Sequence, residues 1–314
     1  MIIFILSGCQ NNSDQLLSYE VTNTSEGYDI GNYLEAQSND FFAEDLATIS
    51  INDTPDSDPV LTSQATLSIN ITDNEVIYQN NAFKELFPAS LTKLLTALVV
   101  FRNAELTDSV TISYNASHIQ EDGAKTCGFN EGDVITLDTL LHCLLIYSGN
   151  DAGIAIAEHV GGSEEGFTKM MNEEAARIGA THSNFMNSHG LHDDLHYTTA
   201  YDLYLIFNEL VQYDKFLSII GKSSYTATYL DFSKNEKEDV FETTNWYFNG
   251  NEEAPEGVTV LGCKTGTTYK AGNCLILLSQ NTEEKSFISI ILKAESSDSL
   301  YSQMTHLLSK TNGN

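Results

Sequence analysis

Residues 87–97 read Phe87-Pro88-Ala89-Ser90-Leu91-Thr92-Lys93-Leu94-Leu95-Thr96-Ala97. A proline is favoured in the first turn of a helix, and the leucines that follow have the spacing of a buried helix. Ser90 and Lys93 lie three residues apart and share one face, so the amine of Lys93 can reach the hydroxyl of Ser90. Apolar surroundings lower the pKa of a lysine and let it act as a base. We therefore predict a serine nucleophile activated by a lysine.

Two further strings follow in order, Ser148-Gly149-Asn150 and Lys264-Thr265-Gly266. The S-x-x-K and K-T-G patterns each occur once, whereas the S-x-N pattern begins at Ser50, Ser68, Ser113, Ser148, Ser233 and Ser279. Only the copy at Ser148 lies between the other two strings and on a tight link between two apolar helices. Each string alone has an ordinary explanation: a helix N-cap before a surface lysine, a Gly-Asn turn, and an edge-strand lysine. Their order favours one shared site.

The predicted elements indicate a sheet built from both ends of the chain, with a helical block inserted between them. Alternating apolar and polar residues predict a β-hairpin over residues 65–78, turning at 72–75. Besides the helix that Pro88 opens, the predicted helices span 138–145, 151–160, 163–179, 199–210 and 297–308. The predicted strands span 111–113, 225–232, 258–267, 274–279 and 287–292. We therefore predict an α/β fold with a central antiparallel sheet flanked by helices.

The chain is strongly acidic. Its 314 residues carry 44 acids and 15 bases, for a net charge of −29. Such a surface repels nucleic acid, so a nucleic-acid partner is excluded. Residues 10–64 contain no lysine or arginine and are rich in Asn, Ser and Thr. This composition predicts a flexible acidic spacer, in which only apolar residues such as Tyr33, Leu34, Phe41 and Phe42 would dock locally.

The N-terminus resembles a lipoprotein signal. Leu6-Ser7-Gly8-Cys9 is similar to the lipobox of bacterial lipoproteins, in which the cysteine is lipidated after cleavage. The run before it is short and lacks positive charge, so we expect the start to be clipped; the alternative is a chance cysteine at an apolar end. No other stretch approaches the ~20 apolar residues of a membrane helix. We therefore expect residues 1–9 to be a signal and membrane attachment to depend on lipid at Cys9.

The remaining cysteines and the histidines point to no cofactor or metal. Cys127, Cys143, Cys263 and Cys274 form no C-x-x-C pattern. Cys263 and Cys274 flank a turn and are either a disulfide or two buried thiols. His182, His189, His192 and His196 surround Asp193 and Asp194, but their spacing is irregular and no H-E-x-x-H helix is present.

The residues around the three strings extend them into a resemblance to D-alanyl-D-alanine carboxypeptidases, the low-molecular-mass penicillin-binding proteins. The segments that carry it are Phe87 to Ala97, Ser148-Gly149-Asn150-Asp151-Ala152, Asn187-Ser188-His189-Gly190-Leu191, His196-Tyr197-Thr198-Thr199-Ala200 and Lys264-Thr265-Gly266-Thr267-Thr268. The resemblance runs from about Thr66 to the C-terminus. Glycine in the middle of S-x-N is typical of this branch, whereas class A β-lactamases usually carry aspartate there and an E-x-x-L-N string that this chain lacks after Ser148.

The resemblance implies the β-lactamase/DD-peptidase-like fold and removal of the terminal D-alanine from peptidoglycan stem pentapeptides. Ser90 would attack the penultimate carbonyl and Lys93 would accept its proton. Ser148 would relay a proton to the leaving amine, and Asn150 would orient Lys93 and the substrate amide. Water would then hydrolyse the acyl-enzyme, and no cofactor is implied.

The resemblance also implies which residues bind the substrate. Lys264 and Thr265 would hold the terminal carboxylate, with Gly266 and Thr267 beside them on the strand. Backbone N–H groups of Ser90 and Thr267 would hold the oxyanion. The implied partners are stem peptides and, as covalent inhibitors, β-lactam antibiotics. The expected location is the outer face of the bacterial cytoplasmic membrane.

We expect three regions: a signal and lipobox over residues 1–9, the spacer over 10–64, and the catalytic domain over 65–314. Within the catalytic domain, the sheet part spans about 65–115 and 215–314 and the helical part about 116–214. The chain ends soon after the last strands, so we expect no additional C-terminal β-domain. Two other functions compete with the carboxypeptidase: a serine β-lactamase and an inactive wall-binding lipoprotein with the same fold.

Overall fold

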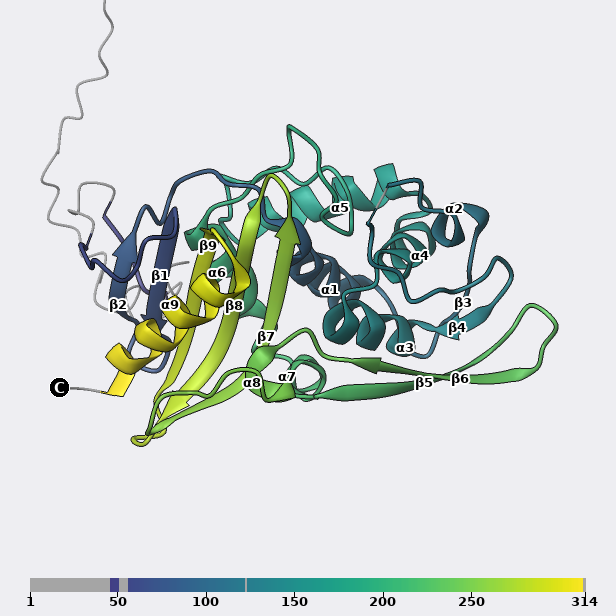
Figure 1. Ribbon diagram of the computed structural model, residues 1–314. Helices are drawn as coiled ribbons and strands as arrows, with labels where there is room; N and C mark the ends of the chain where they lie inside the picture. The colour runs from purple at the N-terminus through teal and green to yellow at the C-terminus, as the bar shows by residue number, and fades with distance from the viewer. Residues whose placement is uncertain (1–45, 51–55, 122, 313–314) are drawn as a thin grey trace, which may run out of the picture. The chain divides into compact units, whose positions relative to one another are not determined.

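A five-stranded antiparallel sheet joins the N-terminal and C-terminal parts of the described chain (Figure 1). The computed structural model describes residues 46–50, 56–121 and 123–312. The strand order is β2-β1-β9-β8-β7. The strands are β1 (Ala65–Asn70), β2 (Glu75–Asn80), β7 (Val258–Thr268), β8 (Gly272–Asn281) and β9 (Ser286–Ala294). This arrangement confirms the predicted sheet from both chain ends, whereas the predictions for Cys9 and for residues 10–45 lie outside the described residues.

Side chains alternate between the two faces of the central sheet, and each face is covered. On β8, Leu275 and Leu277 pack with helix α9 (Ser297–Ser309), whereas Cys274 and Ile276 belong to the larger core on the other face. Cys263 packs on the α9 side, so Cys263 and Cys274 face opposite ways, and both are free thiols. Of the two alternatives for this pair, the structure therefore selects buried thiols.

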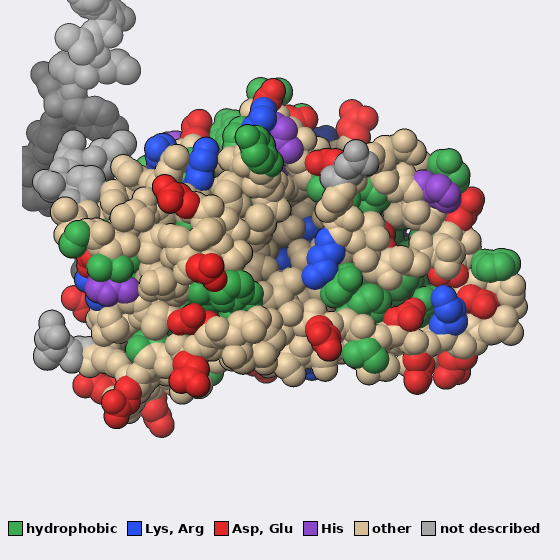
Figure 2. Space-filling view, viewed as in Figure 1, with side chains coloured by type: hydrophobic (Ala, Val, Ile, Leu, Met, Phe, Trp, Pro, Cys, Tyr) green, Lys and Arg blue, Asp and Glu red, His purple; other side chains and the backbone are tan. Residues whose placement is uncertain are grey.

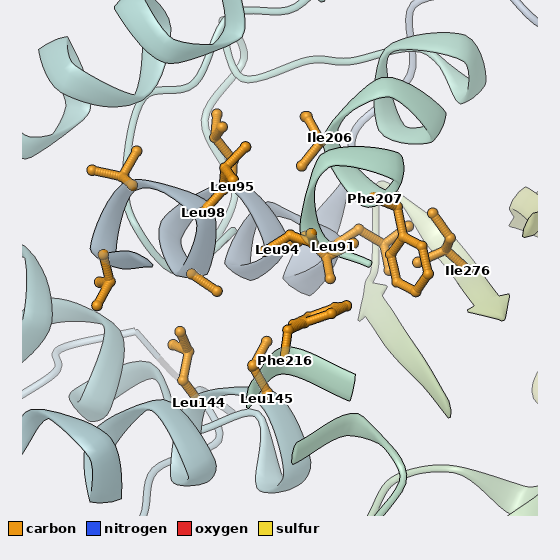
Figure 3. Close-up of a cluster of buried hydrophobic side chains, with 14 of the residues drawn as sticks. Leu91, Leu94, Leu95, Leu98, Leu144, Leu145, Ile206, Phe207, Phe216 and Ile276 are labelled. Carbon is orange, nitrogen blue, oxygen red and sulfur yellow. The ribbon is translucent and has the colours of Figure 1, made fainter. Parts of the chain in front are cut away.

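Helix α1 (Thr92–Asn103) runs through the middle of the larger core (Figure 3). All residues from Thr92 to Val100 are buried. In Figure 3 its leucines lie among side chains of helix α6 (Ala200–Leu210), helix α7 (Asp214–Ile220) and strand β8. Because this part of α1 is enclosed on all sides, even Thr92, Lys93 and Thr96 are removed from water. The predicted helix that follows Pro88 is confirmed, preceded by a 3-10 turn, η2 (Ala89–Leu91).

The inserted block is helical, with helices on each side of the Ser148 loop. Its helices are α2 (Tyr114–Ser117), α3 (Leu137–His142), α4 (Asn150–Gly161) and α5 (Glu164–Arg177). The helix predicted over 138–145 ends earlier than expected, because the chain continues as a π-helical turn, η3 (Cys143–Tyr147). Ser113, predicted on a strand, instead caps α2 by accepting a hydrogen bond from the N–H of Ala116.

A second antiparallel sheet corrects the sequence prediction for the strand over 225–232. That strand, β5 (Ser224–Leu230), does not join the central sheet; it pairs in the order β3-β4-β5-β6. The partners are β3 (Ser109–Thr111), β4 (Val134–Thr136) and β6 (Glu236–Glu242). Only Ala227 and Tyr229 of β5 are buried, so it has one apolar face and does not suit a sheet covered on both sides.

Two short helical elements remain, and a hydrogen bond joins the segment before β1 to helix α9. Helix α8 (Trp246–Asn249) lies between β6 and β7, and the 3-10 turn η4 (Lys310–Asn312) follows α9. The backbone N–H of Ser63 donates to Oε1 of Gln303 in α9 at 2.8 Å. Within the described ranges, no helix combines the length and apolar character needed to cross a membrane.

Candidate active site

Ser90 is the middle residue of turn η2, which leads directly into helix α1. Its Oγ is 2.9 Å from Nζ of Lys93, as the three-residue spacing predicts. Ala89, just before it, has a positive φ of 48°. Gly190 packs so tightly against this turn that a Cβ there would be 2.0 Å from the carbonyl oxygen of Ala89. The His189-Gly190 segment therefore fixes the turn that presents Ser90.

Lys93 is fully buried and makes no ion pair with any residue that the structure describes. Besides Ser90, its Nζ donates to Oδ1 of Asn150 at 2.7 Å and to the carbonyl oxygen of His189 at 2.5 Å. Burial, and next the nearby charge of Lys264, hold the pKa of Lys93 well below its ordinary value. A lysine in this environment loses its proton readily and can accept the proton of the Ser90 hydroxyl.

The loop at Ser148 brings a second hydroxyl and an amide to the same place. Ser148 ends the π-helical turn in a left-handed conformation, with φ 71° and ψ 31°. Its Oγ accepts a hydrogen bond from Nζ of Lys264 at 2.9 Å. The backbone N–H of Asn150 donates to the carbonyl oxygen of Lys125, which ties the loop to the segment before it. The loop therefore links the two buried lysines through Ser148 and Asn150.

Strand β7 forms another wall of the site, next to the Ser90 turn and the Ser148 loop. Lys264 is buried, and this burial lowers its pKa to about 7. Gly266 allows a close approach to the nucleophile turn, since a Cβ there would lie 3.0 Å from the backbone nitrogen of Ser90. The Oγ1 of Thr265 is 2.6 Å from Oγ1 of Thr244. A substrate carboxylate beside this wall would meet the Lys264 ammonium and the Thr265 hydroxyl.

A cleft opens between these walls. Its lining residues are Ser90, Lys125, Ser148, Thr244, Trp246, Thr265, Gly266, Thr267, Ser297, Leu300 and Tyr301. Figure 2 shows basic side chains at the hollow in the middle of this face and acidic side chains around it. The structure thus brings together all the catalytic and substrate-binding residues predicted from the sequence, while Cys9 lies outside the described residues.

Sequence analysis missed several cleft residues. Trp246 stacks on Tyr301 with ring centroids 4.5 Å apart, and together they form an aromatic wall. Trp246 is the only tryptophan of the chain, which is a signal that sequence analysis could have used. Lys125 had no such signal, because it lies outside every recognised motif and reaches the cleft only through the tertiary fold.

Two of the histidines, His189 and His196, support this site. The Nε2 of His189 is 3.1 Å from Oε1 of Glu164, and Nε2 of His196 is 2.9 Å from Oγ1 of Thr92. His192 pairs with Asp194 at 3.0 Å. In the part of the chain that the structure describes, no three His, Cys, Asp or Glu residues are grouped as metal ligands.

Comparison with known proteins places the chain in a family. Residues 52–296 match the family described as D-alanyl-D-alanine carboxypeptidase. The chain is 30% identical over 239 residues to D-alanyl-D-alanine carboxypeptidase DacF of Bacillus subtilis, covering 74% of this chain and 58% of that protein. It is 29% identical over 259 residues to D-alanyl-D-alanine carboxypeptidase DacC of Escherichia coli, covering 80% and 61%. The chain therefore spans about three fifths of the length of these two relatives.

The fold is shared with solved structures. The crystal structure of the Streptomyces K15 DD-transpeptidase superimposes with a TM-score of 0.74 at 24% identity, covering 82% of this chain and 98% of that one. D-alanyl-D-alanine carboxypeptidase DacD of Francisella tularensis gives a TM-score of 0.69, covering 84% and 73%. The resemblance to this fold, expected from the sequence, is confirmed. By its sequence match over residues 52–296, the chain belongs to the D-alanyl-D-alanine carboxypeptidase family.

Proposed function

We propose that this chain is a serine D-Ala-D-Ala carboxypeptidase that removes the terminal D-alanine from peptidoglycan stem pentapeptides. The observation that carries the proposal is the 2.9 Å contact between Oγ of Ser90 and Nζ of the buried, pKa-lowered Lys93 at the cleft. The family match and the names of the relatives support the same activity. The same nucleophile would be acylated by β-lactams, so these antibiotics are proposed as covalent inhibitors.

The proposed catalytic cycle consists of acylation of Ser90 and hydrolysis of the acyl-enzyme. Neutral Lys93 takes the hydroxyl proton as Oγ of Ser90 bonds to the penultimate carbonyl carbon, and Asn150 orients the amine. The proton that Lys93 accepted is relayed through Ser148 to the leaving amine, so Lys93 becomes neutral again and Lys264 keeps its charge and its hydrogen bond to Ser148. The C–N bond breaks and D-alanine leaves. Water then attacks the acyl-serine, its proton returns to Ser90, and the shortened peptide is released.

Residues of strand β7 bind the substrate. Lys264 and Thr265 hold the terminal carboxylate, and Gly266 keeps the strand close to the nucleophile. The backbone N–H groups of Ser90 and Thr267 are the proposed donors to the oxyanion. Lys264 must be charged for this role whereas Lys93 must be neutral, which requires their pKa values to differ once the substrate carboxylate is bound.

The first prediction is that the purified chain releases D-alanine from a stem pentapeptide and that Ser90→Ala abolishes this release. Removal of a nucleophile from a lysine-activated site leaves at most a trace of activity, a loss of about 10³-fold or more. Released D-alanine is measured with a D-amino-acid oxidase assay, and circular dichroism checks that the variant is folded. A folded wild type that releases no D-alanine would leave the inactive wall-binding protein as the better description.

A fluorescent penicillin separates the carboxypeptidase from the β-lactamase alternative. A carboxypeptidase of this kind is expected to stay labelled at Ser90, because its acyl-enzyme with penicillin breaks down slowly. Rapid turnover of the penicillin, with no lasting label and no D-alanine release, would favour the β-lactamase instead.

We also propose that the protein is a secreted lipoprotein, anchored by lipid on Cys9 to the outer face of the bacterial cytoplasmic membrane. The supporting observation is the Leu6-Ser7-Gly8-Cys9 sequence, followed by the acidic stretch that would act as a tether. The test is mass spectrometry of the mature N-terminus and the fate of Cys9→Ala. Equal recovery of wild type and variant in the soluble fraction would contradict the anchor.

A further inference from the structure

The charge of the cleft is opposite to that of the chain. The protein carries −29 overall, yet no Asp or Glu is among the residues that line the cleft. Lys125 lines the cleft, and its charge lowers the pKa values of Lys93 and Lys264, the two buried lysines of the site. The proposed reaction uses Lys93 as the base and Lys264 for the terminal carboxylate. Lys125 has no part in it.

Lys125 is held in the cleft without an anionic partner. Its Nζ lies 3.9 Å from the ring centroid of Tyr147, and its carbonyl oxygen accepts the N–H of Asn150, so the main chain at Lys125 is fixed to the catalytic loop. The side chain is exposed and lines the same hollow as Ser90 and Ser148. Among the described residues, no carboxylate forms an ion pair with it.

Three other solvent-accessible lysines of this protein have a carboxylate partner, whereas Lys84 and Lys234 are exposed outside the cleft and form no ion pair with a described residue. Lys215 pairs with Asp138 at 2.6 Å, Lys285 with Asp73 at 2.9 Å and Lys270 with Asp194 at 3.1 Å. In a chain with almost three acids for every base, a cation that faces a cleft with no carboxylate in its wall is placed to meet an anion from outside.

We propose that Lys125 binds a second carboxylate of the substrate, carried by the residue that precedes the two D-alanines. The inference rests on the proposed function and follows from the chemistry of the peptide end. Each D-alanine has only a methyl side chain, and the single terminal carboxylate belongs with Lys264 and Thr265. Any further anion must therefore come from the acyl-donor part of the peptide. The substrate class is a stem peptide whose third residue has a free side-chain carboxylate.

The test uses two pentapeptides that differ in one group. In one, the third residue is diaminopimelate with its side-chain carboxylate free, and in the other that carboxylate is a carboxamide of nearly the same shape. Wild type is expected to prefer the carboxylate peptide by about tenfold in kcat/KM, the scale of one charge-assisted hydrogen bond in a partly desolvated cleft. Lys125→Met is expected to bring the ratio close to one, and Lys125→Arg to keep most of it.

The ratio of the kcat/KM values for the two peptides reports on the contact between Lys125 and the side-chain carboxylate alone. Lys125 also influences the pKa of Lys93, but that effect acts on both peptides alike and cancels in the ratio. Lys169→Met is the matched control, because Lys169 is an exposed surface lysine paired only with Glu173. Raising the salt concentration should shrink the wild-type preference, as for any accessible ion pair.

The outcomes are distinct. If folded wild type hydrolyses both peptides with equal kcat/KM, or if Lys125→Met leaves the preference intact, the role of Lys125 is wrong and the carboxypeptidase stands. If neither peptide loses D-alanine, the proposed function itself fails. A preference lost in Lys125→Met, kept in Lys125→Arg and kept in Lys169→Met supports the inference.

Discussion

Lys93 and Lys264 are two buried lysine side chains, and no carboxylate among the described residues pairs with either. Hydrogen bonds to hydroxyl, amide and carbonyl oxygens replace only part of their lost hydration. Burial is therefore the leading reason that both pKa values are lowered. A buried lysine that carries a charge costs free energy of folding, so stability alone does not explain why the chain has this pair. The two lysines lower the stability of the fold but are needed for the proposed catalysis.

For Lys264, this cost in folding free energy leads to a prediction about stability. Lys264→Met is expected to raise the free energy of unfolding at pH 6 by about 1–2 kcal/mol, the scale of a buried polar group's desolvation cost, while it abolishes D-alanine release. Urea unfolding gives the stability of each protein. The exposed Lys169→Met serves as the control and should change little. A Lys264→Met protein less stable than wild type at pH 6 would contradict this account.

The same variant has a defined pH dependence. The pKa of Lys264 is about 7 in the folded protein and near its ordinary value of 10.5 in the unfolded chain. Between these values the unfolded state binds the extra proton, so the stability of wild type rises with pH through this window. The advantage of Lys264→Met is therefore largest below pH 7 and shrinks towards pH 10.

At the scale of elements, the catalytic loop depends on how it packs against the segment that carries Lys125. A Cβ at Gly149 would lie 2.3 Å from Sγ of Cys127 and 2.9 Å from Oδ1 of Asp151. The carboxylate of Asp151 in turn accepts the backbone N–H groups of Cys127 and Gly128 at 2.9 Å. The middle of the S-x-N string is therefore glycine for lack of space, although its φ of −61° is open to any residue.

Gly149→Ala should accordingly destabilise the fold by about 1–3 kcal/mol, the usual cost of overpacking. Cys127→Ala in the same chain removes the nearer clash and should restore part of the loss, with a coupling of at least about 1 kcal/mol in a double-mutant cycle. Urea unfolding of wild type, both single variants and the double variant measures it. Strictly additive effects would show that the thiol does not limit the space at residue 149.

Elements with strong apolar periodicity could be predicted from the sequence, and weakly patterned ones could not. The helix after Pro88 and the strands β8 and β9 have near-continuous apolar residues because both sides are buried. Strand β6 reads Glu-Lys-Glu-Asp-Val-Phe-Glu and buries only Phe241, so its sequence carries little strand signal. The π-helical turn at Cys143–Tyr147 was predicted as part of an ordinary helix over 138–145.

At the scale of the whole molecule, the order of elements predicted the central sheet but not the second one. Pairing between β4 and β5 joins residues about a hundred positions apart, and no local pattern specifies such a partner. The same limit applies to the site. Ser90 and Lys93 were predictable because one helix turn joins them, whereas Lys125 and Trp246 reach the cleft from distant segments.

Asp58, in the segment before β1, forms ion pairs with two residues at the C-terminal end of the described chain. The Oδ2 of Asp58 lies 2.6 Å from Nζ of Lys310 and 2.9 Å from Nε2 of His306. Hydrogen bonding to Lys310 first, and to His306 next, holds the pKa of Asp58 well below its ordinary value. A carboxylate with a lowered pKa in the folded state stabilises it above the unfolded pKa of 3.8, and this contribution is lost as the pH falls below that value.

Asp58→Asn should therefore lower the free energy of unfolding at pH 7 by about 0.5–1 kcal/mol, the range of a partly exposed ion pair. The difference from wild type should narrow as the pH falls below 3.8, because wild type then progressively loses the same contribution. Urea unfolding at pH 7 and at successively lower pH values measures both effects. Glu238→Gln, on the exposed face of β6, is the control and should match wild type at pH 7. A difference that stays constant down to the lowest pH would show that Asp58 acts through its shape and hydrogen bonds rather than its charge.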